Sequence, residues 1–168
     1  MKGQFTLALA AAAVCLVCAG AANKTPILIY NPSPSAPIGW YKLTRADDYQ
    51  IGNLVAAKIP DWAAHFAHSR GYLPEDMPVI KTLIAGPETR FCIRGGVMTV
   101  PDFAPFVIHS TDSQGRDMPV QPDGCRSLDA GEYLLGSVSY DRSFDSRYFG
   151  SVGHADLIGR VSFIGEVE

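Results

Sequence analysis

The stretch Val79-Ile80-Lys81-Thr82-Leu83-Ile84-Ala85-Gly86-Pro87 (residues 79–87) is an apolar, β-branched run that ends at a glycine and a proline. Similar short apolar runs follow between Gly and Pro residues at 91–93, 97–100, 106–108, 133–138 and 161–164. β-Branched and aromatic residues fit strands, whereas Gly and Pro favour the turns between strands. Many short strands at this spacing predict a mainly β fold.

The chain before this stretch fits the same fold. Strand-like segments are expected at 27–30, 40–43 and 54–59. Residues 62–70 predict a short helix, because Asp61 can cap its first turn and Gly71 can end it. We therefore expect a single β domain that carries one or two short helices.

The composition restricts the classes of protein to which the chain can belong. The 168 residues are 47% hydrophobic and 18% charged, which is typical of one globular domain rather than of a disordered chain. The net charge is -3, and neither sign forms a block along the chain. Such a chain presents no basic run to a nucleic-acid backbone, so we expect no nucleic-acid partner.

The N-terminus has the character of an export segment. Lys2 is followed by an apolar run from Phe5 to Ala22 that contains no charged residue. Small residues at 19–22 suit a cleavage site, while the run is also close to the length of a membrane-spanning helix. A removed signal and a retained anchor are both open. We expect residues 1–22 to direct export to the periplasm and residues 23–168 to form the folded domain.

Four cysteines divide between these two parts of the chain. Cys15 and Cys18 lie in the apolar segment, which leaves Cys92 and Cys125 in the exported part. In an oxidising compartment two such residues favour a disulfide. The bridge would close a loop of about 34 residues and stabilise the fold by ~3 to 4 kcal/mol on the chain-entropy model. Two unpaired buried thiols are the alternative.

Lys81 lies in the middle of the apolar run, where a lysine is unusual. If the side chain is buried, the loss of solvation lowers the pKa of its amine, and the neutral amine can act as a general base. If the strand lies at a sheet edge, the lysine faces water on the polar side. The pattern of the run on its own favours the edge strand.

Ser35 lies in a proline-rich stretch, residues 31–37 (NPSPSAP). The three prolines fix φ and remove backbone donors, so the stretch is predicted to be a rigid loop that holds the serine at a defined, exposed position. Serines in such loops are usually ordinary turn residues. The role of Ser35 therefore has to be inferred from the residues around it.

Three segments carry a resemblance to type I signal peptidases. Residues 31–41 (NPSPSAPIGWY) resemble the nucleophile box, and the spacing Ser-x-Pro-x-Gly-x-Tyr is similar to that of the TraF branch of the family. Residues 81–87 (KTLIAGP) resemble the general-base box, in which a lysine precedes an apolar run and a Gly/Pro turn. Residues 143–150 (SFDSRYFG) resemble the Ser-x-Asp-Ser-Arg-Tyr-(Trp/Phe)-Gly box, the most specific of the three. The boxes occur in the family's order.

Two departures from the family's pattern favour the specialised TraF branch over a general signal peptidase. Residues 87–89 read Pro-Glu-Thr where the family usually has Pro-Gly-Asp. Residues 137–140 (SVSY) replace the Gly-Asp-Asn-Arg lead into the last box of general signal peptidases. The resemblance implies a signal-peptidase-like β fold. It also implies a periplasmic disulfide, which Cys92 and Cys125 would supply.

The resemblance assigns roles position by position. It implies that Ser35 is the nucleophile and that Lys81 is the base that accepts its proton. The backbone N–H of Ser35 would help to form the oxyanion hole, and Ser33 matches a position whose hydroxyl assists. Ser143 matches the serine that orients the base. The charged residues of the last box, expected to form a structural pair that fixes its loop, are Asp145 and Arg147.

This chemistry requires neither a cofactor nor a metal. A neutral lysine can take the serine proton and later return it to the leaving amine. The histidines suggest no better triad, since His65 and His68 lie on the predicted helix and His109 and His154 are isolated. His65 and His68 have the spacing of two metal ligands, but two ligands do not make a site, and a solvated helix face is the expected alternative.

The sequence therefore suggests a periplasmic serine endopeptidase, associated with the cytoplasmic membrane, that cleaves an exported precursor after small residues. The resemblance to the TraF branch implies a pilin-like precursor and allows a substrate amine to resolve the acyl-enzyme into a cyclic product. A non-catalytic periplasmic β domain that acts as an adaptor of a secretion or conjugation apparatus is the alternative. A self-cleaving repressor-type protease shares the dyad, but the export segment and the lack of a DNA-binding domain in the sequence argue against it.

Overall fold

The structure is a computed structural model that describes residues 27–74 and 76–166. The expected export segment at 1–22, with Cys15 and Cys18, lies outside the described residues. Within the described ranges, no helix combines the length and the hydropathy that a membrane span requires.

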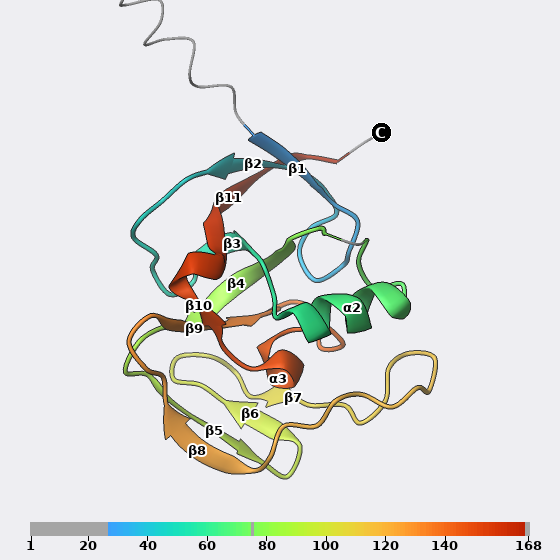
Figure 1. Cartoon of the computed structure of the whole chain (residues 1–168), viewed down its shortest axis with the longest axis vertical. Coiled ribbons are helices and arrows are strands. Elements are labelled where there is room, and N and C mark those ends of the chain that lie inside the picture. Colours follow the sequence, from blue (N-terminus) through green and yellow to red (C-terminus); the bar gives the residue numbers. More distant parts are fainter. Residues whose placement is uncertain (1–26, 75, 167–168) are drawn as a thin grey trace, which may run out of the picture.

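The described residues form two antiparallel β-sheets, which lie one above the other in Figure 1. The larger sheet has the strand order β1-β2-β11-β3-β4-β9-β10, and the smaller has the order β7-β6-β5-β8. The strands of the larger sheet are β1 (Ile27–Asn31), β2 (Gly39–Thr44), β3 (Leu54–Ala57), β4 (Val79–Ala85), β9 (Glu132–Gly136), β10 (Val152–Gly153) and β11 (Leu157–Gly165). Those of the smaller sheet are β5 (Arg90–Arg94), β6 (Val97–Thr99), β7 (Phe106–Val107) and β8 (Gly124–Ser127).

Short helices complete the described part of the chain: α2 (Asp61–Ser69), α3 (Ser146–Phe149) and the single 3₁₀ turn η1 (His154–Asp156). The expectation of a mainly β fold with one or two short α-helices is confirmed. The runs of apolar residues predicted most strands to within one or two residues, whereas β8, β10 and the position of α3 were not predicted.

β4 is an interior strand of the larger sheet, because it pairs with β3 on one side and with β9 on the other. Every residue of β4 except Thr82 is buried, so both faces of the strand are covered. Lys81 lies opposite Val55 of β3. The edge-strand interpretation of Lys81 is therefore wrong, because the strand that covers the second side, β9, comes from a distant part of the sequence.

Helix α2 covers the face of β4 that carries Lys81. Val79 and Leu83 share that face with Lys81, since side chains alternate along a strand. Both pack in one core cluster with Ala63 of α2. The helix therefore closes the sheet over the lysine.

The helix begins one residue earlier than expected. Asp61 is its first residue and does not cap it. The N-cap is Pro60, whose carbonyl oxygen accepts hydrogen bonds from the backbone N–H groups of Ala63 and Ala64. The other end fits the expectation, because Gly71, at φ 71°, takes the left-handed conformation that follows many helices.

Two backbone positions explain features of the sequence motifs. Gly39 has φ 143°, and a Cβ atom there would lie 2.4 Å from the carbonyl oxygen of Gly165, so only glycine allows β2 and β11 to approach at this point. Glu88 has φ 65°, in the left-handed region that favours glycine. The turn after β4 thus has a backbone conformation that favours glycine, although residue 88 is a glutamate.

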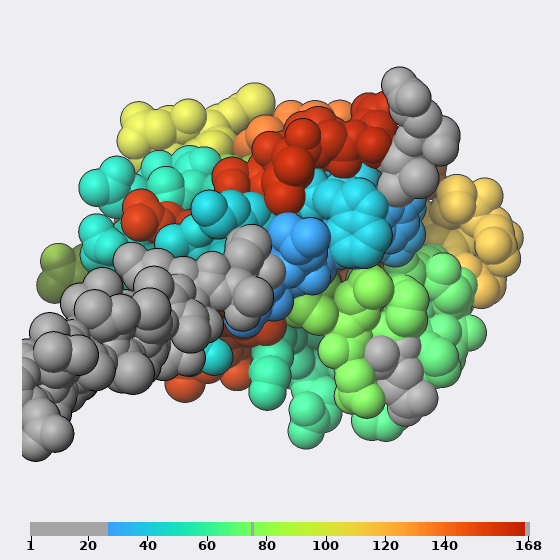
Figure 2. All heavy atoms as spheres, turned by 90° about the horizontal axis from the view of Figure 1, so that it is seen from above, coloured from blue at the N-terminus to red at the C-terminus, as the bar shows by residue number. Residues whose placement is uncertain are grey.

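Large apolar side chains are exposed where β1, β2 and β11 form one end of the larger sheet. Figure 2 views the molecule from this end and shows the three strands side by side at the surface. β1 follows directly on residues 1–26. This surface, called the apolar end here, comprises Ile27, Leu28, Ile38, Trp40, Phe163 and Ile164.

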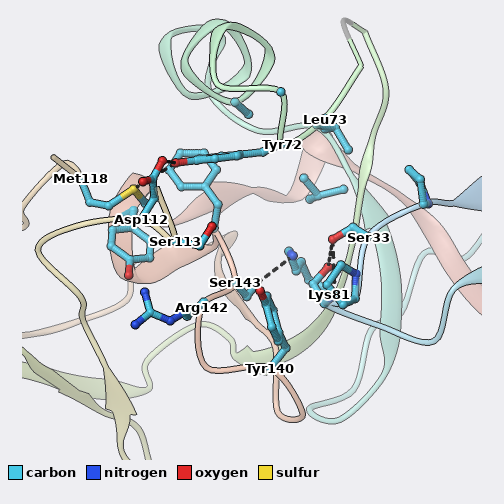
Figure 3. Close-up of a pocket in the computed structure, with 18 of the residues that line it drawn as sticks. Ser33, Tyr72, Leu73, Lys81, Asp112, Ser113, Met118, Tyr140, Arg142 and Ser143 are labelled. Atoms are coloured by element: carbon cyan, nitrogen blue, oxygen red, sulfur yellow. Dashed lines mark hydrogen bonds between the residues drawn. The ribbon is translucent and has the colours of Figure 1, made fainter. Parts of the chain in front are cut away.

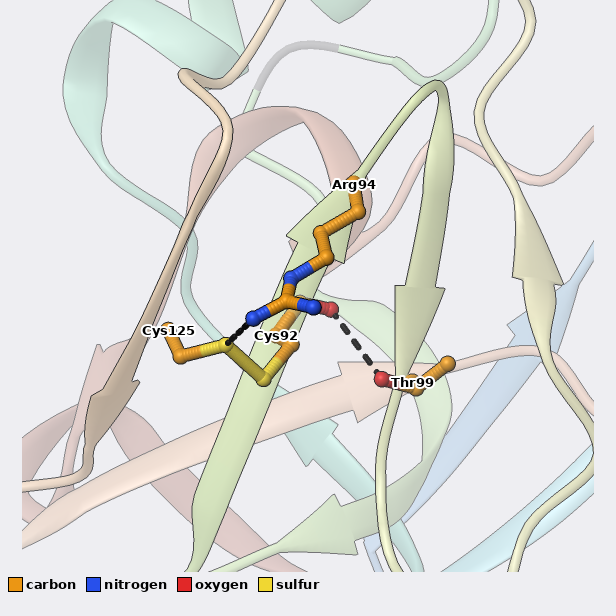
Figure 4. The surroundings of a disulfide bond; sticks show 4 residues. All are labelled: Cys92, Arg94, Thr99 and Cys125. Atoms are coloured by element: carbon orange, nitrogen blue, oxygen red, sulfur yellow. Dashed lines mark hydrogen bonds between the residues drawn. A yellow bond between two sulfur atoms is a disulfide. The ribbon is translucent and has the colours of Figure 1, made fainter.

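A disulfide joins Cys92 and Cys125 across the smaller sheet. The two residues lie directly opposite each other on β5 and β8. Figure 4 shows the bond together with Arg94, which donates a hydrogen bond to the Cys125 sulfur, and with Thr99, which donates to the Cys92 carbonyl. The alternative of two unpaired thiols does not apply to this structure.

Candidate active site

The loop that carries Ser35 is held by Asn31, the buried last residue of β1. Its side-chain amide nitrogen donates to the carbonyl oxygens of Ser33 (2.8 Å), Ala36 (3.1 Å) and Pro37 (3.1 Å). Its side-chain oxygen also accepts from the backbone N–H of Ser33 at 3.2 Å, so the loop folds around one side chain that both donates and accepts. Asn31 thus adds to the restriction that the prolines impose.

Ser35 is only 6% exposed, so the expectation of an exposed serine is wrong. Its hydroxyl lies 3.0 Å from the hydroxyl of Ser33, and its backbone N–H donates to the same Ser33 oxygen at 3.4 Å. The Ser33 hydroxyl therefore lies beside both the oxygen and the N–H of Ser35. An oxyanion formed by attack of Ser35 would need donors at this place.

Ser137 is a contact of the Ser35 loop that sequence reasoning missed. Its hydroxyl donates to the Ser35 carbonyl oxygen at 2.7 Å, and its backbone N–H donates to a carboxylate oxygen of Asp145 at 3.2 Å. Ser137 thus links the Ser35 loop to the segment 143–150. The sequence carries no signal for this link, because residue 137 lies in the segment that departs from the general family pattern.

Lys81 is 4% exposed, and its amine donates a hydrogen bond to the Ser143 hydroxyl at 2.8 Å. Burial lowers the pKa of Lys81 from its ordinary value of 10.5 to about 8. The nearby carboxylate of Asp145 opposes this shift, and the guanidinium of Arg147 adds to it. A lysine in this environment can be neutral near the pH at which many proteins work.

The segment 143–150 is anchored by a buried ion pair. Asp145 and Arg147 are 0% and 1% exposed, and the guanidinium nitrogen Nε lies 2.8 Å from the carboxylate. Asp145 also caps helix α3 by accepting from the backbone N–H of Arg147. Ser146, the next residue, accepts from the backbone N–H of Leu135 on β9 at 2.8 Å. The segment is therefore fastened to the larger sheet beside β4.

Ser33, Ser35, Lys81 and Ser143 all line one cavity of about 300 Å³. Its walls are the 31–35 loop, the end of α2 with the turn after it, β4, and the segments 109–118 and 140–148. Figure 3 shows Lys81 between Ser33 and Ser143 within this cavity. Asp145 and Arg147 lie behind the wall, and the disulfide belongs to the smaller sheet, away from these walls.

Two histidines expected to be isolated have partners. His109 lines the cavity, and its ring nitrogen Nε2 lies 3.2 Å from the carboxylate of Asp141. Its backbone N–H donates to the hydroxyl of Tyr148. His154 lies 3.3 Å from the hydroxyl of Tyr133. These contacts join residues far apart in sequence, so spacing alone did not indicate them.

The described residues contain no group of three or more His, Cys, Asp or Glu side chains that could hold a metal ion. On helix α2, His65 contacts the backbone carbonyl of Asp61 at 2.9 Å. What the cavity does contain is a hydroxyl next to a backbone N–H, and a buried amine of lowered pKa held by a second hydroxyl. Such an arrangement suits nucleophilic attack by serine with lysine as the base.

Comparisons with known proteins show which proteins the chain is similar to. The family model described as "Signal peptidase, peptidase S26" matches residues 2–165. A probable conjugal transfer protein TraF of Sinorhizobium fredii (strain NBRC 101917 / NGR234) is 31% identical over 140 residues, 77% of this chain and 72% of the relative. The conjugal transfer protein TraF of Agrobacterium fabrum (strain C58 / ATCC 33970) is 32% identical over 141 residues, 77% of each chain. Signal peptidase I of Enterococcus faecalis V583 is similar in structure with a TM-score of 0.41 and 17% identity, over 71% of this chain and 100% of that one.

Proposed function

Because the chain belongs to the signal peptidase family, peptidase S26, we propose that it is a serine endopeptidase with Ser35 as nucleophile and Lys81 as general base. The observation that carries the proposal is the state of Lys81. It is a buried lysine with a pKa of about 8, and it lines the same cavity as Ser35. A charged amine has no free electron pair, so the lowered pKa is what makes it a base near neutral pH.

In the acylation step, Lys81 takes the proton of the Ser35 hydroxyl while the Ser35 oxygen attacks the carbonyl carbon of the substrate. The C–N bond then breaks, and protonated Lys81 gives its proton to the leaving amine. The Ser35 N–H and the Ser33 hydroxyl would stabilise the oxyanion. In the structure the Ser35 hydroxyl pairs with Ser33, so it has to exchange this partner for the Lys81 amine, and catalytic hydrogen bonds commonly tighten when substrate binds.

Two acceptors can resolve the acyl-enzyme. Water gives a carboxylic acid and a linear product. An amine of the substrate gives a new amide bond, and the product is then cyclic. In both cases neutral Lys81 takes a proton from the attacking group, and Ser35 recovers its proton from Lys81. The mass of the product distinguishes the two, because cyclisation leaves out one water molecule.

For the substrate, we propose an exported precursor of conjugative transfer, of the pilin type. The two relatives named conjugal transfer protein TraF support this role. We also propose that residues 1–22 direct export and that the domain 23–168 works in the periplasm at the cytoplasmic membrane. The exposed apolar end of the sheet, adjoining residues 1–26, supports contact with a membrane.

The test is co-expression with the pilin-like precursor of the same transfer locus, with the precursor mass read by mass spectrometry. Wild type should shorten the precursor, and Ser35→Ala and Lys81→Ala should leave it intact. Matched controls are Ser162→Ala and Lys42→Ala, because both residues are exposed and face each other on β11 and β2. Processing by either active-site variant would refute the dyad. A precursor that wild type leaves intact would favour the non-catalytic adaptor.

A further inference from the structure

Arg142 lies in the wall of the catalytic cavity, and we propose that its guanidinium binds a carboxylate of the precursor close to the scissile bond. This inference rests on the proposed peptidase function. It assigns to the cavity a second task, the selection of an acidic substrate, in a residue outside the motifs that predicted the dyad.

The position of Arg142 in the chain is the first argument. It precedes Ser143, the residue whose hydroxyl accepts from the Lys81 amine. In Figure 3 its side chain extends away from Lys81, toward the side of the cavity where Asp112 and Met118 lie. Ser35 and Arg142 line the same cavity, so a substrate that reaches Ser35 through it passes the wall that carries the Arg142 guanidinium.

The backbone of Arg142 is held on both sides. The guanidinium of Arg147 donates to the carbonyl oxygen of Asp141 at 2.5 Å and to that of Ser143 at 3.0 Å. The carbonyl oxygens of both residues that flank Arg142 in the chain are thereby tied to a buried residue. Only the side chain of Arg142 has to be ordered when a ligand binds, which lowers the entropic cost of recognition.

The charges around the cavity leave Arg142 without a partner. Among the described residues that line it, Asp112 is the only carboxylate. Its oxygens already accept from the Tyr72 hydroxyl, from the Arg116 side chain and from backbone N–H groups. Within the described part of the chain, the Arg142 guanidinium has neither a hydrogen bond nor an ion pair. An arginine presents paired donors that match a carboxylate, so a substrate carboxylate is the natural occupant.

The gain in kcat/KM expected for an acidic substrate is modest, because Arg142 is exposed to solvent. Ion pairs at such places change an equilibrium by up to about fivefold. They also weaken as salt is added, since mobile ions screen exposed charges. The expected signature is therefore a preference of about this magnitude for acidic substrates, and the preference declines as the ionic strength rises.

The experiment uses peptides in which a single Asp, Asn or Lys is moved through the positions flanking a cleavage site with small residues. With the wild-type enzyme, Asp at one position should raise kcat/KM up to about fivefold over Asn, and Lys should lower it. Arg142→Gln should abolish the Asp/Asn ratio, and Arg142→Glu should invert it to favour Lys. Arg90→Gln, a change at an exposed arginine of the smaller sheet, should keep the wild-type ratio.

A carboxylate can also come from a free C-terminus, so each peptide is compared with its C-terminal amide. Loss of the preference on amidation alone would identify the terminal carboxylate as the ligand. The inference is overturned if wild type and Arg142→Glu show the same Asp/Asn/Lys ratios at every position. Failure of the proposed function has a different signature, because wild type would then leave every peptide uncleaved, or Ser35→Ala would cleave the Asn peptides as fast as wild type.

Discussion

Replacing Lys81 by methionine should stabilise the fold near pH 7 while it removes activity. Burial lowers the pKa of Lys81 from 10.5 to about 8, and at 1.36 kcal/mol for each pH unit this difference corresponds to about 3 kcal/mol. Methionine is apolar and unbranched, so it fits the space without this cost. It also leaves the Ser143 hydroxyl without its donor, a loss of about 1 kcal/mol. The net gain is about 2 kcal/mol in the free energy of unfolding.

The sign of this effect depends on pH. Below pH 8 the lysine is charged in both the folded and the unfolded state, so the folded wild type bears the whole cost of burying the charge. Between about pH 8 and 10.5 the folded lysine is neutral while the unfolded one keeps its proton. The stability of the wild type then rises with pH, because the unfolded state binds more protons. Above this range the methionine variant should be the less stable protein, by about 1 kcal/mol.

The assay is urea unfolding of both proteins, with the disulfide intact, at about pH 7 and at about pH 10.5. The quantity to compare is the difference between the two proteins, since other groups titrate equally in both. Lys42→Met is the control, because Lys42 is exposed on β2 of the same sheet, and this change should not reproduce the stabilisation expected for Lys81→Met at pH 7. A Lys81→Met variant that is less stable than wild type at pH 7, or a difference independent of pH, would refute the reasoning.

Three further predictions follow from the site. The kcat/KM of wild type should rise about tenfold for each pH unit below about 8 and level off above it, because only neutral Lys81 accepts a proton; a flat profile would mean another base. Ser143→Ala should lower kcat by about 100-fold with little change in KM, because it releases the Lys81 amine from its position; an effect on KM alone would contradict this. Arg147→Met should destabilise the fold by about 3 to 5 kcal/mol in urea unfolding, because it leaves the Asp145 carboxylate buried without its partner; a variant as stable as wild type would contradict this.

Most of the fold could be predicted from local sequence, because strands and turns have local signals. The runs at 79–84 and 91–93 lie within β4 and β5, between Gly and Pro residues that end them. β8 was missed because its four residues, Gly124–Ser127, are polar or small and mostly exposed. Its pairing with β5 makes it a strand, and pairing is a property of the whole sheet.

The three motifs gave the family, and the comparisons confirm it. The surroundings of the motif residues could not be predicted in the same way. The interior position of β4 depends on its pairing with β9, and no feature of the sequence at 79–84 indicates that β9 is its partner. The hydrogen bond of Ser137 to the Ser35 loop and the approach of His109 to Asp141 likewise join distant segments. Local patterns identify which residues carry chemistry, whereas burial and neighbours come from the assembled sheet.

The ion pair between Asp145 and Arg147, behind the cavity wall, affects both the stability of the fold and the protonation of Lys81. The Asp145 carboxylate raises the pKa of Lys81 and the Arg147 guanidinium lowers it, so at the lysine the two charges act in opposite directions. Because the pair is buried and in contact, burial rather than either charge decides the protonation of Lys81. A lone carboxylate at this place would favour the charged lysine and move the activity to higher pH. The last motif therefore carries both an aspartate and an arginine for two reasons: together they fasten the segment that holds Ser143, and together they leave the general base free to be neutral.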